Sequence, residues 1–166
     1  MKSICAAFLA SLFFFGGAMS QPLQKDQQEQ QTTKDEIVSA VNTIFGRLET
    51  LNADTLFELY SNSPTFVLFT TEGSVADYQA AKRHHTAWFR QLSALKVSTA
   101  GKEVEVLSGD VAVCAWHGTF DMTFKSGGRS QVDFGITFLF TKHDKRWKVG
   151  YQQTAQLPPT QQSTSK

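Results

Sequence analysis

The spacing of apolar side chains changes near Lys96, and this change constrains the fold more than any other feature of the sequence. Before Lys96, apolar residues recur at the three- and four-residue spacing of amphipathic helices. After Lys96 they alternate with a period of two, which is typical of strands with one buried face. Helices followed by a run of strands predict an α+β domain in which the helices pack against one face of a sheet.

The first predicted helix begins at Thr33, which forms a capping-box spacing with Glu36. Its apolar residues share one helical face: Ile37, Val41, Ile44, Phe45, Leu48 and Leu51. Asp54 begins a short second helix that ends near Asn62, because Pro64 disfavours helical geometry at the residue before it.

A buried strand is predicted over Thr65–Thr70, and a third helix follows it. Ser74 and Asp77 give that helix another capping spacing. Its buried stripe is apolar except at His85.

Four strands are predicted after Lys96, at residues 96–107, 111–124, 130–142 and 146–156. Turn residues separate them at hairpin distances, so the strands form an antiparallel meander. If Gly127 and Gly128 form one two-residue turn, and His143 and Asp144 the next, the pairing of the strands is fixed.

This pairing predicts which side chains share a face of the sheet. One face carries polar residues among large apolar ones: His117, Thr119, Asp121, Tyr151 and Gln153, with Phe134 and Phe138. That mixture is typical of a small-molecule pocket. The opposite face carries Trp116, Phe120 and Met122, and no third layer of the chain is left to cover them, which predicts a homodimer through this outer face.

The first 20 residues are predicted to be a secretory signal peptide. Lys2 precedes an apolar run from Ile4 to Phe15, and small residues at Ala18 and Ser20 place cleavage before Gln21. The run is shorter than the roughly 20 residues of a membrane-spanning helix. We therefore expect an exported protein, periplasmic or secreted, with no membrane segment after cleavage. The lack of Asn-x-Ser/Thr acceptors and of structural disulfides favours a periplasm.

Two polar segments flank the domain and are predicted to be disordered: a Gln-rich linker at 21–32 and a tail at 158–166. The folded domain is then residues 33–157. The chain has 16 Lys and Arg against 15 Asp and Glu, without a basic stripe, which argues against a nucleic-acid partner.

Metal and cofactor chemistry is not expected. Cys114 is the single cysteine of the mature chain, and its apolar strand predicts a buried side chain without a disulfide. His84 and His85 are helical neighbours that point about 100° apart, which does not suit one metal ion. The sequence has no nucleophile elbow, phosphate-binding loop or dinucleotide motif.

Two segments resemble SnoaL-like proteins of the NTF2-like (nuclear transport factor 2-like) superfamily. Ala53–Tyr60 is similar to the helix that precedes the first strand in that family, and Trp147–Thr154 is similar to its closing strand. The resemblance covers residues 35–156. It implies a cone-shaped barrel, with three N-terminal helices packed in a strongly curved, mostly antiparallel sheet, and a dimer through the outer sheet face.

The sequence departs from the family where acid-base residues often lie. Tyr151 and Gln153 stand where His is common late in the closing strand, and Asn62 and Ser63 stand where two Asp commonly follow the second helix. The favoured hypothesis is therefore an exported module that binds a small, largely apolar molecule. The alternatives are a cofactor-free isomerase, cyclase or dehydratase, and a non-catalytic dimerisation scaffold whose cavity is filled by side chains.

The candidate site follows from these hypotheses. Asp121 is the predicted general base and His117 its partner, separated by about 13 Å along the strand at roughly 3.3 Å per residue. The predicted ligand-binding residues share a position on a pocket-facing stripe or face: Tyr60, His85, Trp88, Thr119, Phe134, Phe138, Tyr151 and Gln153.

Overall fold

The second half of the chain forms four long antiparallel strands in a meander. They are β3 (Leu92–Ser108), β4 (Val111–Phe124), β5 (Arg129–His143) and β6 (Arg146–Gln156). The computed structural model describes residues 21–158, so the predicted signal peptide and residues 159–166 of the predicted tail lie outside the described residues.

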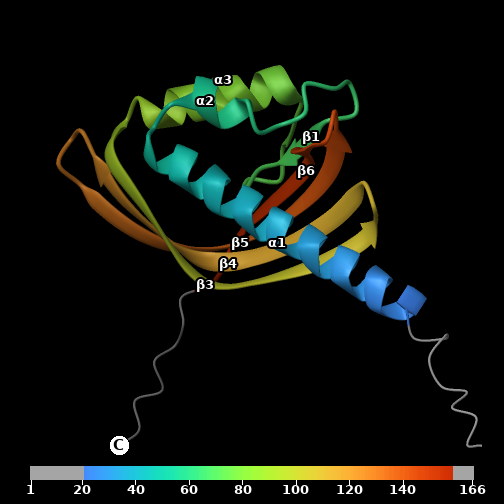
Figure 1. Cartoon of the computed structure of the whole chain (residues 1–166). Coiled ribbons are helices and arrows are strands. Elements are labelled where there is room, and N and C mark those ends of the chain that lie inside the picture. The colour runs from blue at the N-terminus through green and yellow to red at the C-terminus, as the bar shows by residue number, and fades with distance from the viewer. Residues whose placement is uncertain (1–20, 159–166) are drawn as a thin grey trace, which may run out of the picture.

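Two short strands complete a six-stranded sheet with the order β2-β1-β6-β5-β4-β3. Strand β1 (Val67–Phe69) pairs parallel with β6 and antiparallel with β2 (Val75–Ala76). The sheet curls beneath three helices, α1 (Gln21–Glu49), α2 (Ala53–Phe57) and α3 (Tyr78–Phe89) (Figure 1). The predicted α+β architecture, with helices packed against the concave face of a curved sheet, is confirmed.

Helix α1 lies across the concave face and anchors the core. Its predicted apolar stripe is buried, with Ile37 and Val41 fully inaccessible to solvent. The Phe45 ring lies 4.4 Å, between centroids, from the ring of Trp116 on β4. Burial of this stripe supplies most of the helix's stability, because isolated helices of ordinary sequence are marginal in water.

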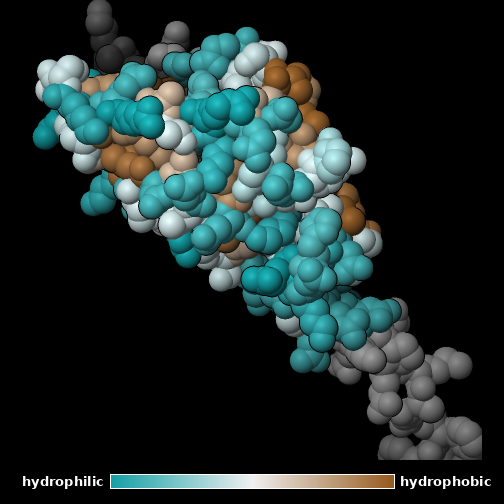
Figure 2. Space-filling model, turned by 90° about the horizontal axis from the view of Figure 1, so that it is seen from above, coloured by the Kyte–Doolittle hydropathy of each residue, from teal (hydrophilic) through white to brown (hydrophobic). Residues whose placement is uncertain are grey.

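The helix begins earlier than predicted. It starts at Gln21, so the segment 21–32 that was predicted to be a disordered linker continues α1, and residues 26–32 are exposed. Gln, Glu and Lys propagate a helix at little cost once a packed segment has nucleated it. Figure 2 shows this protruding part as strongly hydrophilic. The capping box at Thr33 is therefore wrong.

The other two helices begin at side-chain caps. The Asn52 Oδ1 accepts hydrogen bonds from the backbone N–H groups of Asp54 and Thr55, so α2 begins slightly earlier than predicted. The Asp77 carboxylate accepts from the N–H of Ala80 at 2.7 Å and caps α3 as predicted. Among residues 21–158, no helix is long and apolar enough to cross a bilayer.

The β4–β5 hairpin has a different turn from the predicted one. Gly127, with φ of 92°, adopts a left-handed conformation, and Phe124 N–H donates to the carbonyl of Gly128 at 2.8 Å. The loop therefore has three residues and pairs Thr123 with Arg129. This register differs from the predicted one by an odd number of residues, so β4 presents the opposite set of side chains to the interior.

The β5–β6 hairpin also differs. Asp144 and Lys145 both have positive φ, 48° and 63°, and form the two-residue turn one position later than predicted. A bulge at Gly150 then shifts the register, because Val149 pairs with Phe140 whereas Tyr151 pairs with Leu139. Beyond this bulge, β6 points Gln152 inward and its neighbours Tyr151 and Gln153 outward.

The predicted homodimer surface is therefore wrong. Trp116, Phe120 and Met122 are buried on the concave side, with exposed fractions of 2%, 6% and 8%. Helix α1 covers Trp116 and Phe120, since the Phe45 ring packs near both of their rings. Cys114 is fully buried, as predicted, and is a free thiol.

Candidate functional site

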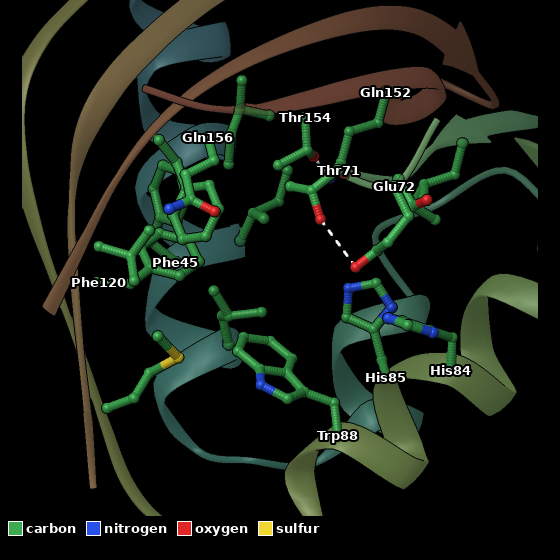
Figure 3. Close-up of a pocket in the computed structure, with 18 of the residues that line it drawn as sticks. Phe45, Thr71, Glu72, His84, His85, Trp88, Phe120, Gln152, Thr154 and Gln156 are labelled. Carbon is green, nitrogen blue, oxygen red and sulfur yellow. Dashed lines mark hydrogen bonds between the residues drawn. The ribbon is translucent and has the colours of Figure 1, made fainter. Parts of the chain in front are cut away.

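A cavity of about 570 Å³ lies on the concave side of the sheet. Helices α1 and α3, the loop after β1, and the inner faces of β4, β5 and β6 supply its walls. In Figure 3, the residues of β6 form one wall and His84, His85 and Trp88 of α3 lie opposite. Its size suits a small organic molecule.

Most of the cavity wall is apolar. The Phe120 ring lies 4.9 Å from the Phe134 ring and 6.3 Å from the Phe45 ring, which joins β4, β5 and α1 in one aromatic surface. Further apolar lining residues are Ile44, Leu48, Leu68, Trp88, Met122, Phe124, Val132, Ile136 and Phe138. Such a surface favours an apolar ligand, because transfer of apolar area out of water drives binding.

A chain of hydrogen bonds runs along the β6 wall. Buried Tyr60 donates its hydroxyl proton to Gln152 Oε1 at 2.7 Å, and Gln152 Nε2 donates to Thr154 Oγ1 at 3.0 Å. Burial raises the pKa of Tyr60 far above its usual value, so its phenol stays neutral. Gln152 is itself 6% exposed, and these bonds satisfy a polar side chain within an apolar interior.

His85 is a second buried titratable group in the cavity wall. Its Nδ1 lies 2.9 Å from the Ala81 carbonyl oxygen, and the rings of Phe57 and Phe89 lie 5.2 and 5.9 Å from its own. Burial lowers the pKa of His85 to about 4. At neutral pH the ring is therefore uncharged, and because a carbonyl oxygen can only accept, Nδ1 carries the proton. Nε2 is left as an acceptor.

Polar residues of the β1–β2 hairpin and α3 surround the cavity opening. Glu72 is exposed and accepts a hydrogen bond from the Thr71 hydroxyl at 3.0 Å (Figure 3). Hydrogen bonds from Thr70, Glu72's own backbone and Thr71, with the charge of His84, lower the pKa of the Glu72 carboxyl. Glu72 is the carboxylate that lines this cavity.

The comparison with known protein families identifies the domain. A profile of the SnoaL-like domain family matches residues 37–157. The chain belongs to the SnoaL-like domain family. The predicted family resemblance is confirmed, whereas no curated protein sequence matches the chain.

Solved structures have the same fold as this SnoaL-like domain. A predicted calcium/calmodulin dependent protein kinase II association domain from Xanthomonas campestris has 26% identity and a TM-score of 0.66, over 75% of this chain and 87% of that chain. A predicted dehydratase of the NTF2-like family from Streptomyces avermitilis has 12% identity and a TM-score of 0.69, over 77% and 98%. An NTF2-like superfamily protein from Salmonella enterica has 15% identity and a TM-score of 0.70, over 82% and 99%.

The SnoaL-like domain brings five of the predicted site residues to the cavity: Tyr60, His85, Trp88, Phe134 and Phe138. The helical residues among them follow the predicted stripe. Phe134 and Phe138 face inward together with Val132, Ile136 and Phe140, because alternate residues of a strand share one face.

The other five predicted residues lie on the outer face of the sheet. Asp121 and His117 are both exposed there, and they pair across the ladder with Gln131 and Gly135. Thr119 donates to Asp133 at 2.6 Å, and Tyr151 donates to Gln153 at 3.3 Å. The predicted catalytic pair is therefore not in the cavity, because the register of the β4–β5 hairpin turns Asp121 and His117 outward.

The outer face has a hollow of its own. It has a volume of about 520 Å³ and lies around His117, Gly135, Thr137 and Gln153. Among residues 21–158, no group of three or more His, Cys, Asp or Glu is arranged to hold a metal ion in either place.

Sequence reasoning missed Gln152, Thr154 and Glu72 as cavity residues. A signal for the first two was present, since Tyr60 follows the apolar residues Leu56 and Leu59 and a buried phenol needs an acceptor. Gly150 within a strand was a second signal, because an isolated glycine there often marks a bulge.

Proposed function

We propose that this SnoaL-like domain binds a small, uncharged and largely apolar molecule in the concave cavity. The observation that carries the proposal is an apolar wall interrupted by neutral, hydrogen-bonded polar groups at Tyr60, Gln152 and His85. A charged ligand would lose its hydration there without an opposite charge in the depth of the cavity to replace it.

The wall chemistry favours binding over turnover. A general base works best when its pKa lies near the working pH, and the pKa of about 4 makes His85 a weak base at neutral pH. Asp121, the base expected from the sequence, faces away from the cavity. Glu72 is a carboxylate, but it is exposed at the opening.

An enzymatic function is the second candidate. It is supported by the unprotonated Nε2 of His85 in the cavity wall, and by similarity in fold to a predicted dehydratase. In that case His85, with Glu72 near the opening, would move a proton on a bound substrate in cofactor-free isomerisation, cyclisation or dehydration. Asp121 and His117 would take no part.

The scaffold alternative required a cavity filled by Phe134, Phe138 and Trp147. The two phenylalanines line the cavity without filling it, and Trp147 lies elsewhere, where its Nε1 donates to Glu36 at 2.7 Å. A homodimer remains a proposal for this chain, through exposed small residues of the outer face such as Ala115 and Thr137. Similarity to a predicted association domain supports it.

Export also belongs to the proposal. We propose that cleavage before Gln21 releases the mature domain into a periplasm or the medium. Intact-mass measurement of the protein purified from its native host tests this, since a chain that begins at Met1 would contradict export by cleavage.

The binding proposal is tested with N-phenyl-1-naphthylamine, a neutral apolar dye whose fluorescence rises in apolar surroundings. Val132 lines the cavity, and its neighbour Gln131 is exposed on the outer face. Val132→Trp should weaken dye binding by at least about tenfold because the new ring occupies cavity volume. The matched control Gln131→Trp should change it by less than about twofold.

Absence of dye binding to the unaltered protein, or equal loss in both variants, would contradict binding in the cavity. Circular dichroism and the unfolding midpoint of each variant establish that it is folded at the assay temperature.

A further inference from the structure

The hydrogen bonds inside the cavity have a fixed direction along the β6 wall. Tyr60 is buried and neutral, so its hydroxyl has to donate, and the acceptor it meets is Gln152 Oε1. This orients the carboxamide with Nε2 toward Thr154, whose Oγ1 accepts. The Thr154 hydroxyl proton then has no acceptor among residues 21–158, and Thr154 lines the cavity.

The β6 wall thus offers a hydrogen-bond donor to the cavity, whereas the α3 wall offers an acceptor. The Ala81 carbonyl takes the Nδ1 proton of His85, which leaves Nε2 with a lone pair and no protein donor among the described residues. Figure 3 shows the His85 ring directed into the cavity from α3, across from Thr154 on β6. The low pKa of His85 keeps this nitrogen unprotonated at neutral pH.

We infer that the cavity selects a ligand of defined polarity: an apolar body with an oxygen acceptor at the Thr154 end and a hydroxyl or N–H donor at the His85 end. Hydroxylated aryl ketones are the simplest members of this class. The inference rests on the proposed binding function and adds the chemistry that orients the ligand.

Two features make the polarity a property of this chain rather than of one rotatable group. A free threonine hydroxyl can donate or accept, but Thr154 already accepts from Gln152, which itself is held by Tyr60. A free imidazole can exchange tautomers, but His85 is held in one of them by a backbone oxygen. A ligand with the reverse polarity would leave the hydroxyl proton of Thr154 and the Nε2 lone pair of His85 without partners in an apolar wall, which is costly.

The test uses four compounds that share one two-ring scaffold. They are 4-hydroxybenzophenone, with donor and acceptor; benzophenone, with the acceptor alone; 4-benzylphenol, with the donor alone; and diphenylmethane, with neither. Each is titrated as a competitor of N-phenyl-1-naphthylamine at pH 7. The proteins are the unaltered chain, Thr154→Val, Thr154→Ser and His85→Phe.

Each comparison is between the dissociation constants of one compound for two proteins. The free energy of hydration of the compound is the same in both and cancels. Thr154→Val should weaken the two ketones by roughly three- to tenfold and leave the other two compounds within about twofold. Thr154→Ser keeps the hydroxyl and should preserve ketone binding. His85→Phe should weaken the two phenols by a similar factor and leave benzophenone and diphenylmethane within about twofold.

The outcomes separate this inference from the function it rests on. If all four compounds bind the unaltered protein and neither Thr154→Val nor His85→Phe discriminates among them, the cavity binds apolar molecules but the polarity assignment is overturned. A gain in phenol binding by His85→Phe would overturn it as well. If neither the dye nor any of the four compounds binds, the proposed function itself fails.

Discussion

The two faces of this sheet carry similar kinds of residues, but one face is buried around the cavity and the other is exposed to solvent. Both include aromatic, hydroxyl and amide side chains. On the concave face, Trp116 and Gln152 are buried beneath helix α1 and around the cavity, with every buried side-chain N or O atom among residues 21–158 hydrogen-bonded. On the outer face, His117 and Asp121 are exposed.

The difference shows that the face to which a side chain points determines whether the residue is buried in the core or exposed to solvent. Trp116 and His117 are neighbours in sequence, yet one packs against Phe45 and the other lies in solvent. A shift of the strand pairing by one residue would exchange their positions, because side chains alternate between the two faces of a sheet. Position relative to the turn, rather than residue type, decides which residues can reach a ligand.

The largest expected effect comes from truncating these neighbours in turn. Trp116→Ala should lower the free energy of unfolding by about 3–5 kcal/mol, because it removes a fully packed ring and leaves a void. His117→Ala should change it by no more than about 0.5 kcal/mol. Urea unfolding followed by circular dichroism measures both values. Equal losses in the two variants would contradict the assignment of faces.

A second prediction concerns pH and the inner face. Unfolded His85 titrates near 6.5, whereas the folded group titrates near 4. Between these values the unfolded chain binds more protons, so the free energy of unfolding falls as pH drops from 6.5 to 4, by up to about 3 kcal/mol from this group. His84, the neighbouring titratable charge, also disfavours protonation of His85.

Urea unfolding of the unaltered chain and of His85→Phe at several pH values isolates this contribution. The variant's stability should depend less steeply on pH within that window. Parallel pH profiles would show that the folded His85 titrates normally and would contradict its burial in the wall.

A smaller effect is expected from adding one methyl group to each face. At Gly118 on the inner face, a Cβ would overlap the carbonyl oxygen of Ser98 and lie 2.5 Å from a ring carbon of Trp116. Gly118→Ala should therefore cost about 1–3 kcal/mol of unfolding free energy. At Gly135 on the outer face, the new Cβ would lie 3.4 Å from a methyl carbon of Leu157, an ordinary contact. Gly135→Ala should cost little, and thermal unfolding of both variants checks the contrast.

The smallest expected effect is at the residue that the sequence marked as a general base. Asp121→Asn should leave dye binding within about twofold of the unaltered protein, because its side chain lies on the face opposite the cavity. Fluorescence titration measures the dissociation constant. A loss of tenfold or more would mean that Asp121 reaches the ligand and that the register of β4 differs from the one described.

Local features of the fold were predictable from the sequence. The stripe from Ile37 to Leu48 and the cap at Asp77 depend on residues a few positions apart. They can therefore be predicted without knowing how the strands pair. His85 and Trp88 line the cavity for the same reason, since both lie on the predicted stripe of α3. Tyr60 also lines it, although the predicted second helix ends at Phe57 rather than near Asn62. The family resemblance supplied the cone-shaped arrangement.

The sheet side of the site was not predictable in the same way. Which residues of β4 face the cavity depends on the turn between β4 and β5. Gly127 and Gly128 could form a two-residue turn, or Gly127 could close a three-residue loop, and both are compatible with the sequence. The bulge at Gly150 also exchanges the faces to which the following residues of β6 point. An error at the first hairpin moved Asp121 and His117 into the predicted cavity, and an error at the second concealed Gln152 and Thr154.

Two tryptophans give the most direct measurement, because they lie at different hollows. Trp88 lines the concave cavity, and Trp147 lines a separate hollow beside α1 and α2. Their indole N–H resonances can be followed in a ¹⁵N–¹H correlation spectrum during titration with N-phenyl-1-naphthylamine. The proposed function predicts that the Trp88 resonance shifts most and the Trp147 resonance stays in place. A saturable shift of the Trp147 resonance with the Trp88 resonance unchanged would contradict binding in the concave cavity.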